Sequence, residues 1–422
     1  MKRGFQDMKC GLLGEHLGHS FSPQIHAELA DYSYALYELP HEDLGAFVRN
    51  GEPDAFNVTI PYKKEVVPFL DEISDEARAI GAVNTVVRRN GRLYGYNTDY
   101  FGFDYMIGAS GVDMRGQKAL VLGKGGASAT ACAVLRDRGV GELVVLGSKE
   151  NVPENLAKHT DATVIVNTSP VGMYPATGVS PVELSQFPRC ICVLDVIYNP
   201  NKTALLLQAE ERNITAVGGL PMLVAQAVKA FSLFTGEEAE EDRIDSILQA
   251  INREMKNVIL IGMPGCGKST VGRLLAEELK RPFFDADTEF ESMHGMTPAA
   301  AIQALGEESF RQMEHQTLCE LGKKSGVVIA CGGGVVTRED NYAPLHQNGV
   351  ILFLERDLEK LATDGRPLSQ NCSVETLWRQ RESGYRRFAD LTVISTEHPT
   401  KTALAMKEAF LAYNHTCVWK RR

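Results

Sequence analysis

The chain has 422 residues, a length that predicts two or three domains rather than one. Its hydrophobic content of 44% and charged content of 23% are typical of a globular protein. The net charge of −10 excludes a broad basic surface, so we expect no nucleic-acid partner. The sequence shows no secretory signal and no apolar run of membrane length, so we expect a cytoplasmic protein that does not bind membranes.

Polar side chains recur after the strand and turn signals of the first 100 residues. Taken singly, each is more typical of a helix cap or a turn than of a binding site. Together they offer hydroxyls, amides, one lysine and one carboxylate, which suits a small polyhydroxylated ligand better than an apolar one. These side chains are Ser20, Ser22, Asn57, Thr59, Lys63, Asn84 and Asp99.

A glycine turn of the dinucleotide-binding type follows the apolar run 118–122. The turn contains Gly123, Gly125, Gly126 and Ala127, and an apolar helix is predicted directly after it. A second strand is predicted to end at Gly147-Ser148-Lys149, where such folds discriminate between ribose groups. Lys149 is the available cation for a 2′-phosphate, which favours NADP over NAD, although Glu150 lies next to it.

The clearest change in composition lies between residues 236 and 257. An acidic run, 237–242, is followed by Ile244, Ile247 and Ile251 at helical spacing. An apolar strand begins almost at once, so the sequence predicts two units that join near residue 253 without a long linker.

The second unit opens with a strand, a glycine loop and an apolar helix over residues 257–279. The loop fits the pattern G-x-x-x-x-G-K-[ST], in which backbone N–H groups surround phosphate oxygens. Lys268 is expected to reach the β- and γ-phosphates, and Ser269 to hold Mg²⁺. We expect a nucleoside triphosphate to bind Gly262, Gly265, Cys266, Gly267, Lys268, Ser269 and Thr270.

Acids, glycines and arginines follow in separate segments of this unit. Asp285 and Asp287 stand at alternate positions at a predicted strand end, so we expect both side chains on one side, one for Mg²⁺ and one for a substrate hydroxyl. Three glycines, 332–334, let the backbone approach a ligand closely. A single arginine on a helix indicates a solvated face as readily as a binding site. Several arginines from separate segments indicate carboxylate and phosphate binding.

Residues 9–250 resemble shikimate dehydrogenases in order and spacing. The matching segments are S-x-S-P (20–23), N-V-T-I-P-Y-K (57–63), G-A-V-N-T (81–85), N-T-D (97–99), G-x-G-G-A (123–127), N-T-S-P-V-G-M (167–173), D-V-I-Y-N-P (195–200) and G-x-P-M-L-V-A-Q-A (219–227).

This resemblance implies NADPH-dependent reduction of the C3 carbonyl of 3-dehydroshikimate. Lys63 would be the acid/base, with Asp99 as its partner, and the pair would titrate as a unit. The family often has N-R-[TS] where this chain has Gly147-Ser148-Lys149, and residues 149–163 form a short span. An NAD-linked enzyme acting on quinate therefore stays an alternative. The ring would be held by Ser20, Ser22, Thr59, Asn84 and Gln226, and the cofactor by Gly123, Gly125, Gly126, Ala127 and Lys149.

Residues 256–415 resemble shikimate kinases. The match implies that Asp285 lies behind the metal and that Asp287 receives the shikimate hydroxyl. Arg366 belongs to a lid segment that is shorter here and lacks the arginine that usually stacks on adenine. The shikimate carboxylate would be held by Arg311 and Arg381, with Gly333 over the ring.

The two resemblances converge on consecutive reactions, so the sequence predicts a bifunctional shikimate dehydrogenase and shikimate kinase with small-molecule substrates. The predicted fold is α/β: a substrate domain and a Rossmann-like NADP-binding domain, then a P-loop kinase domain with a parallel sheet. A sensor that keeps the pockets without chemistry is an alternative, and the oligomeric state stays open. The predicted domains are 1–100, with helices around 219–253 packing back on it, then 101–235, a helical connection 236–255, and 256–422.

Overall fold

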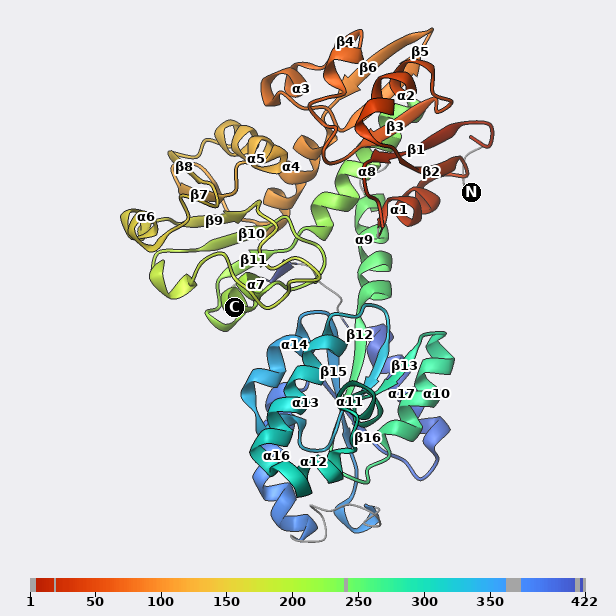
Figure 1. Cartoon of the computed structure of the whole chain (residues 1–422), viewed down its shortest axis with the longest axis vertical. Coiled ribbons are helices and arrows are strands. Elements are labelled where there is room, and N and C mark those ends of the chain that lie inside the picture. Colours follow the sequence, from red (N-terminus) through yellow and green to blue (C-terminus); the bar gives the residue numbers. More distant parts are fainter. Residues whose placement is uncertain (1–4, 19, 239–241, 362–372, 414–417, 420–422) are drawn as a thin grey trace.

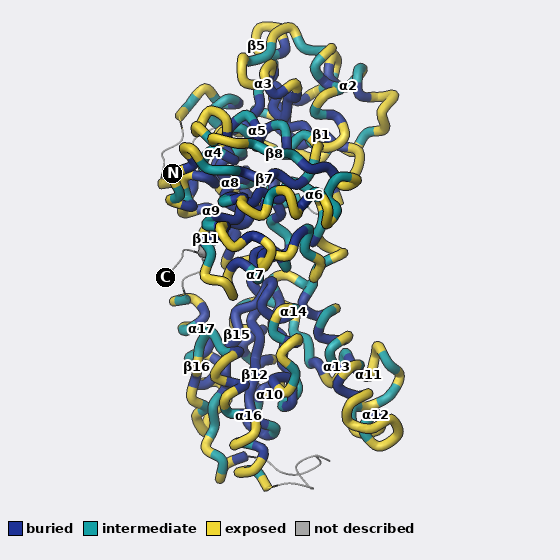
Figure 2. Tube along the Cα trace, turned by 90° about the vertical axis from the view of Figure 1, so that its left-hand side faces the viewer, coloured by how far each residue is buried: buried dark blue, intermediate teal, exposed yellow. Residues whose placement is uncertain are grey.

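The computed structural model describes residues 5–18, 20–238, 242–361, 373–413 and 418–419. The molecule is elongated, with two sheets of the first half at one end and the second half at the other (Figure 1). Buried positions follow the strands of all three sheets, and exposed positions gather on the outer helices and loops (Figure 2). No helix among the described residues has both the length and the apolar character needed to cross a membrane.

The first sheet is mixed and has the order β2-β1-β3-β5-β6-β4. Strands β2, β1 and β3 run parallel, and β5 is antiparallel to both β3 and β6. Two apolar clusters cover its faces, one of which includes helices from the end of the first half. Its elements are β1 (Lys9–Gly14), α1 (Ser22–Leu29), β2 (Ser33–Glu38), α2 (Leu44–Asn50), β3 (Ala55–Val58), β4 (Glu72–Ile73), α3 (Asp75–Ile80), β5 (Thr85–Arg89) and β6 (Arg92–Tyr96).

The second sheet has the order β17-β11-β10-β9-β7-β8 and is parallel except for β17. The chain leaves β7 toward β8 on one side and returns to β9 on the other, so the turn after β7 lies where the strand order reverses. Ligands bind at such switch points in α/β sheets. The elements are α4 (Thr98–Ser110), β7 (Lys118–Leu122), α5 (Gly126–Asp137), β8 (Glu142–Leu146), α6 (Pro153–Leu156), β9 (Val164–Asn167), β10 (Cys192–Asp195), α7 (Ala204–Glu211) and β11 (Thr215–Val217).

Two helices carry the chain from the first half to the second. Helix α8 (Leu220–Thr235) and helix α9 (Asp242–Met255) join one buried cluster with β1 and α1 of the first sheet. The large apolar side chains of α9 recur at helical spacing, as the sequence predicts, and face this cluster. Because α9 is packed over its whole length and β12 begins two residues after it, the connection between the halves is short and well anchored.

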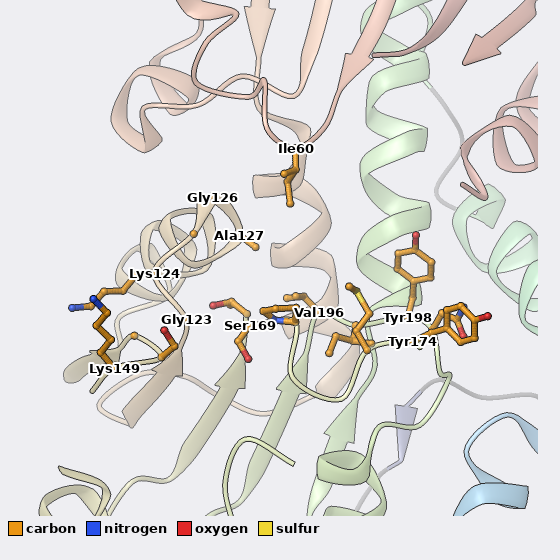
Figure 3. Close-up of a pocket in the computed structure, with 18 of the residues that line it drawn as sticks. Ile60, Gly123, Lys124, Gly126, Ala127, Lys149, Ser169, Tyr174, Val196 and Tyr198 are labelled. Atoms are coloured by element: carbon orange, nitrogen blue, oxygen red, sulfur yellow. The ribbon is translucent and has the colours of Figure 1, made fainter. Parts of the chain in front are cut away.

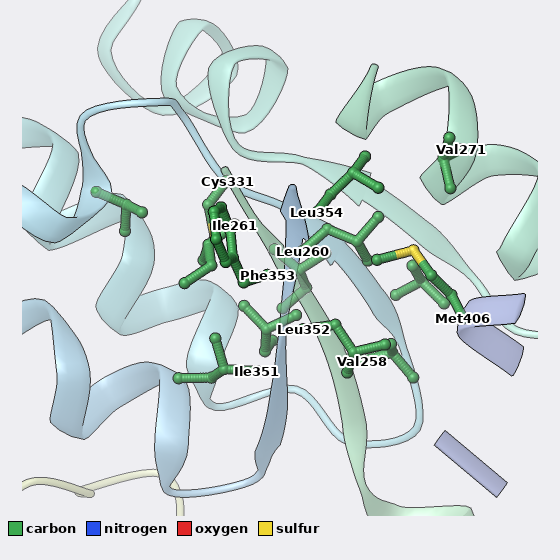
Figure 4. Close-up of a cluster of buried hydrophobic side chains, with 14 of the residues drawn as sticks. Val258, Leu260, Ile261, Val271, Cys331, Ile351, Leu352, Phe353, Leu354 and Met406 are labelled. Atoms are coloured by element: carbon green, nitrogen blue, oxygen red, sulfur yellow. The ribbon is translucent and has the colours of Figure 1, made fainter. Parts of the chain in front are cut away.

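The third sheet is entirely parallel, in the order β13-β14-β12-β15-β16. Its first strand, β12, is central, and the apolar side chains of β12 and β15 form its buried middle (Figure 4). The elements are β12 (Asn257–Ile261), α10 (Lys268–Leu279), β13 (Phe283–Asp285), α11 (Ala286–His294), α12 (Pro298–Leu305), α13 (Glu307–Gly322), β14 (Val328–Ala330), α14 (Tyr342–His346), β15 (Gly349–Glu355), α16 (Val374–Phe388), β16 (Leu391–Ile394) and α17 (Pro399–Ala412).

The last strand, β17 (Val418–Trp419), does not join the third sheet. It pairs antiparallel with β11, with Val418 opposite Val217, and so completes the edge of the second sheet. The domain prediction includes no such return, because a two-residue strand has no recognisable sequence period.

Candidate active sites

The first candidate site is centred on an ion pair between Lys63 and Asp99. Lys63 follows β3, and its carbonyl accepts a hydrogen bond from Val83 N at 2.8 Å. Asp99 lies in the first turn of α4, whose N-terminus is capped by Asn97 Oδ1. Lys63 Nζ lies 2.6 Å from Asp99 Oδ2, and the two side chains are 23% and 12% exposed. Ile60, three residues before Lys63, lines the large cavity of the second sheet. The segment that carries Lys63 therefore reaches that cavity, and the partly exposed ammonium remains open to a ligand.

An amide and hydroxyl network brings Asn84 and Gln226 together. Asn84 Oδ1 accepts hydrogen bonds from Thr98 N at 2.7 Å and Thr98 Oγ1 at 3.2 Å. Thr98 Oγ1 in turn lies 3.3 Å from Gln226 Oε1 on α8. Helices α4 and α8 approach closely because Gly102 has no side chain: a Cβ there would lie 2.6 Å from Met222 O. Residues 84 and 226, far apart in sequence, thus share one site.

The remaining predicted ligands of the ring lie at the carboxyl ends of β1 and β3. Ser20 Oγ accepts a hydrogen bond from Ser22 N at 3.2 Å, at the start of α1. Thr59 N donates to Leu13 O at 2.9 Å, which holds the end of β3 against the end of β1. Neighbouring parallel strands end at the same sheet edge, so the segments that carry Ser20, Thr59 and Lys63 leave the sheet on one side.

Two buried polar residues support this network: Asn57, which belongs to the polar set of the sequence but was not assigned to the ring, and Thr85, which was not predicted. Asn57 Nδ2 donates to Thr85 Oγ1 at 3.1 Å, and Asn57 Oδ1 accepts from Tyr34 OH at 2.8 Å. Thr85 Oγ1 lies 3.1 Å from Thr98 Oγ1, so the chain of contacts reaches the Asn84 network. Asn57 has a sequence signal, since it alternates with Thr59 along the strand. Thr85 has no sequence signal of its own and is marked only by its neighbour Asn84.

A cavity of about 780 Å³ lies at the carboxyl edge of the second sheet and is lined by all five predicted cofactor residues of this half. Gly123 has φ +117°, and a Cβ there would lie 2.7 Å from Thr168 Oγ1, so only glycine fits. At Gly125 and Gly126 a Cβ would meet nothing within 4 Å, so the start of α5 faces open space. Exposed N–H groups at a helix start, with room beside them, fit a pyrophosphate. Lys149 and Ala127 complete the set.

Charged side chains mark one end of this cavity, where Lys124 and Lys149 lie, while Tyr174 and Tyr198 lie at the other (Figure 3). Lys124 Nζ contacts Glu150 Oε1 at 2.6 Å, and Gly147 N donates to Glu150 Oε2 at 2.8 Å. These two contacts lower the pKa of Glu150. Both carboxylate oxygens are engaged, which leaves exposed Lys149 as the cation facing this end.

The glycine loop after β12 has the backbone that its pattern predicts. Gly262, Gly265 and Gly267 have φ values of +149°, +85° and +98°, which favour glycine. Lys268 is buried, and its Nζ donates to Gly262 O at 2.8 Å and Met263 O at 3.0 Å. Cys266 is buried under the loop, whereas Ser269 and Thr270 are exposed at the start of α10. The loop is preformed, and Lys268 must exchange these carbonyls for phosphate oxygens when a nucleotide binds.

The strand-end arrangement predicted for Asp285 and Asp287 is wrong in one respect. Asp285 ends β13, but Asp287 lies in the first turn of α11, because the chain turns into a helix directly after Asp285. Asp285 Oδ1 caps that helix by accepting from Asp287 N at 3.1 Å. The two side chains therefore share a helix start rather than one strand face.

The three glycines 332–334 lie where the predicted residues of this second site converge. A Cβ on Gly332 would lie 2.9 Å from Glu314 Oε1 and 3.4 Å from Asp287 Oδ1. A Cβ on Gly333 would lie 2.6 Å from the ring of Pro264 in the glycine loop. A Cβ on Gly334 would overlap the guanidinium of Arg311. Side chains are excluded on three sides, which explains the run of glycines physically.

Two arginines, Arg311 and Arg381, lie against the glycine segment 332–334. Arg311 Nη1 contacts Glu314 Oε2 at 2.8 Å, and burial raises the pKa of Glu314 although Arg311 opposes that shift. Arg311 Nε is buried without a hydrogen-bond partner in the described part of the chain. Arg381 Nη1 donates to Gly333 O at 3.1 Å, and Tyr385 OH donates to the same oxygen. Glu314 and Tyr385 were not predicted as site residues, although Glu314 has a signal in the spacing Arg311-x-x-Glu314.

Arg366, the predicted lid arginine, lies outside the described residues.

Three family models match the chain. They are described as the shikimate dehydrogenase substrate-binding domain, over residues 12–86, the shikimate 5′-dehydrogenase C-terminal domain, over 219–249, and shikimate kinase, over 264–411. A curated shikimate dehydrogenase (NADP(+)) from Clostridium beijerinckii is 34% identical over 266 residues, which cover 58% of this chain and 98% of that protein.

Solved structures give the same result for the first half. A shikimate dehydrogenase from Peptoclostridium difficile is 36% identical, with a TM-score of 0.52, over 57% of this chain and 97% of that chain. A shikimate 5-dehydrogenase from Thermus thermophilus, solved with NADP(H) and shikimate, is 31% identical, with a TM-score of 0.52, over 58% of this chain and 99% of that chain.

Proposed function

This chain belongs to the shikimate dehydrogenase family and carries a shikimate kinase domain behind it, and from that premise we propose that it catalyses two consecutive reactions. In the first, 3-dehydroshikimate is reduced to shikimate with NADPH. In the second, shikimate is phosphorylated at its 3-hydroxyl with ATP. Both activities of this bifunctional shikimate-pathway enzyme reside in one chain. What we propose is the identity of the substrates and the direction of each reaction.

The 2.6 Å contact of Lys63 with Asp99, three residues after Ile60 of the dinucleotide cavity, carries the first assignment. The cofactor supplies a hydride from its nicotinamide ring when bound. Lys63 donates a proton to the C3 oxygen, so that carbonyl carbon and oxygen gain one hydrogen each. Asp99 keeps the ammonium charged and oriented. Hydroxyls and amides along the sheet edge, Ser20, Ser22, Thr59, Asn84 and Gln226, hold the ring.

The second assignment rests on the convergence of Asp287, Arg311 and the glycine loop around Gly332–Gly334. Asp287 accepts the hydrogen of the attacking hydroxyl, and Arg311 and Arg381 bind the substrate carboxylate in paired contacts. ATP supplies the phosphoryl group, and Lys268 neutralises its charge. Ser269 and Asp285 offer a hydroxyl and a carboxylate, hard oxygen ligands that fit Mg²⁺ together with phosphate oxygens and water. Positioning and charge neutralisation thus suffice for this reaction.

A coupled assay on the purified chain tests both assignments. With 3-dehydroshikimate, NADPH, ATP and Mg²⁺ present, NADPH oxidation and ADP release should both proceed. Lys63→Ala should reduce NADPH oxidation by about 10²- to 10⁴-fold, since it removes the proton donor. Lys268→Ala should abolish ADP release and leave NADPH oxidation unchanged. NADPH oxidation without ADP release in the wild-type chain would contradict the kinase assignment, and a preference for NADH and quinate would contradict the dehydrogenase assignment.

A further inference from the structure

The tyrosine end of the dinucleotide cavity is formed by two loops of the first half. Tyr198 and Asn199 follow β10, and Met173 and Tyr174 follow β9. Tyr174 N donates to Asn199 O at 3.0 Å, so the loops are tied together. The phosphate-binding turn and Lys149 occupy the other end (Figure 3), which leaves this end for the reacting ring of the cofactor. The position of residues 196–199 therefore decides how that ring would be oriented.

The continuation of this loop is buried against the kinase half. Asn201 N donates to Asn348 Oδ1 at 2.8 Å, and Lys202 N donates to Gln347 O at 2.8 Å. Asn201 and Asn348 are 3% and 2% exposed. Asn201 Nδ2 also donates to Asn252 Oδ1 at 2.9 Å, on the helix that joins the halves. Buried polar groups are destabilising when their partners are removed, so these contacts fix the loop.

A buried charged cluster extends the same interface. Lys202 Nζ lies 2.7 Å from Glu210 Oε2 on α7 and 2.5 Å from His346 Nε2 on α14. His346 Nδ1 lies 3.6 Å from Asp390 Oδ2, and Asp390 accepts a hydrogen bond from Ile351 N of β15 at 2.8 Å. The cluster thus links the second sheet to the central strands of the third.

Tyr174 lies at a second place where the two halves face each other. With Pro175, it lines a smaller cavity of about 360 Å³ whose other wall is formed by α11 and α13. The same tyrosine lines the dinucleotide cavity on its other side. Both loops at this end therefore face the kinase half, one through buried hydrogen bonds and the other across this cavity.

We propose that Asn348 and His346 of the kinase half are positioning residues for the dehydrogenase reaction. Among the described residues they contact none of the predicted site residues, and they act through residues 196–202, of which 196–199 line the reacting end of the cavity. This inference rests on the proposed use of NADPH by the first half. Loss of either contact lets the loop relax, so cofactor binding and ring alignment weaken while the kinase site keeps its own residues.

Asn348→Ala in the full chain is the main test. We expect the KM and the directly measured Kd for NADPH to rise about ten-fold, the effect of losing the buried hydrogen bond from Asn201 N. The variant also loses the donation from Asn348 Nδ2 to Gly322 O at 3.2 Å, within the kinase half, which should lower the melting temperature. The KM for 3-dehydroshikimate and the kcat of ADP release should stay within about two-fold of the wild type, because neither substrate contacts this wall. Asn348→Asp keeps the acceptor for Asn201 N but loses the donation from Nδ2 to Gly322 O. It should restore most of the NADPH affinity while the melting temperature stays low, which separates the contact with Asn201 from the contact within the kinase half.

The matched control is Asn341→Ala, because Asn341 is equally buried in the kinase half but donates to Val335 O within that half. It should lower the melting temperature without changing NADPH affinity. His346→Ala is the second variant and decides the matter if Asn348→Ala does not fold. NADPH affinity within two-fold of the wild type in the folded variants would overturn the proposal.

Measuring Kd as well as turnover separates this inference from the proposed function. If the wild-type chain binds NADPH without reducing 3-dehydroshikimate, the proposed reaction is wrong. A ten-fold weaker Kd in Asn348→Ala would then still support the positioning role.

Discussion

At the scale of single residues, two of the lysines of the first site are each paired with one carboxylate. Lys63 has Asp99, and Lys124 has Glu150, so the cation left facing the dinucleotide cavity near the ribose end is Lys149. A preference for NADPH over NADH would therefore depend on one exposed side chain, Lys149, and a single substitution tests it.

Lys149→Ala should raise the KM for NADPH about ten-fold and leave the KM for NADH unchanged, because only NADPH carries a 2′-phosphate for the ammonium to bind. Steady-state kinetics with both cofactors measure this. Lys158→Ala, which removes another exposed lysine of the same half, is the control. An equal loss with NADH would show that Lys149 does not recognise the 2′-phosphate.

Asp195, at the end of β10, is fully buried, and burial raises its pKa to about 7 against the opposing hydrogen bonds from Thr203, Ile197 N and Asn167. A raised carboxyl pKa means that the folded chain binds this proton more tightly than the unfolded chain. Its contribution to stability is therefore complete below about pH 4 and is lost as the pH rises to about 7.

Asp195→Asn should remove this pH dependence. Between pH 4 and 7 the wild-type chain should lose roughly 4 kcal/mol relative to the variant, at about 1.4 kcal/mol for each unit of pKa shift. Urea unfolding at several pH values measures the difference. Asp75→Asn, at an exposed position of α3, should track the wild type. Parallel curves for the wild type and Asp195→Asn would contradict this assignment.

At the scale of elements, the three glycines 332–334 let the parts of the second site pack closely, because they have no side chains. Each glycine faces a different neighbour, namely Glu314 and Asp287, then Pro264, then Arg311. A strand followed by three glycines lets α11, α13 and the glycine loop meet around one backbone segment, which no other residue type permits.

Gly334→Ala should therefore displace Arg311 and reduce phosphoryl transfer by about 10²-fold, since misplacement by about 1 Å has effects of that size. NADPH oxidation should not change. Gly108→Ala, on α4, is the control because a Cβ there meets nothing within 4 Å. Unchanged kinase activity in Gly334→Ala would mean that Arg311 is not needed in its present position.

At the scale of the whole molecule, the two halves share a strand as well as a buried polar interface. Strand β17 closes the second sheet, and Val418 packs against the core between that sheet and α4. Among the described residues, α9, the contacts of residues 201 and 202, and β17 all join the halves.

Ending the chain after Tyr413 should lower the melting temperature by a few degrees, the effect of losing about 1 kcal/mol in a chain of this size. Both activities should persist, because the polar interface at Asn201 and Lys202 is intact. Ending the chain after Trp419 keeps β17 and is the control. Loss of NADPH binding in the shorter chain alone would assign β17 a direct role in the cofactor site.

The sequence by itself determined the local features of this protein. Gly262–Ser269, Gly123–Ala127 and the apolar spacing of α9 are short segments whose backbone preferences and periods act over a few residues, so they are readable without a partner. Lys63 with Asp99, and Asp287 with Arg311, were also named from the sequence by resemblance, and the structure places each pair at one site.

The tertiary structure alone decided what depends on segments far apart in the chain. Asp287 lies on a helix because the chain turns at Asp285, and Glu314 and Tyr385 enter the kinase site through the packing of α13 and α16 on the glycine segment. The contact of Asn201 with Asn348 spans 147 residues, and β17 pairs with a strand some 200 residues away. No local preference encodes such contacts, because asparagines and short apolar pairs are common everywhere and acquire these roles only when the buried surfaces of the two halves meet.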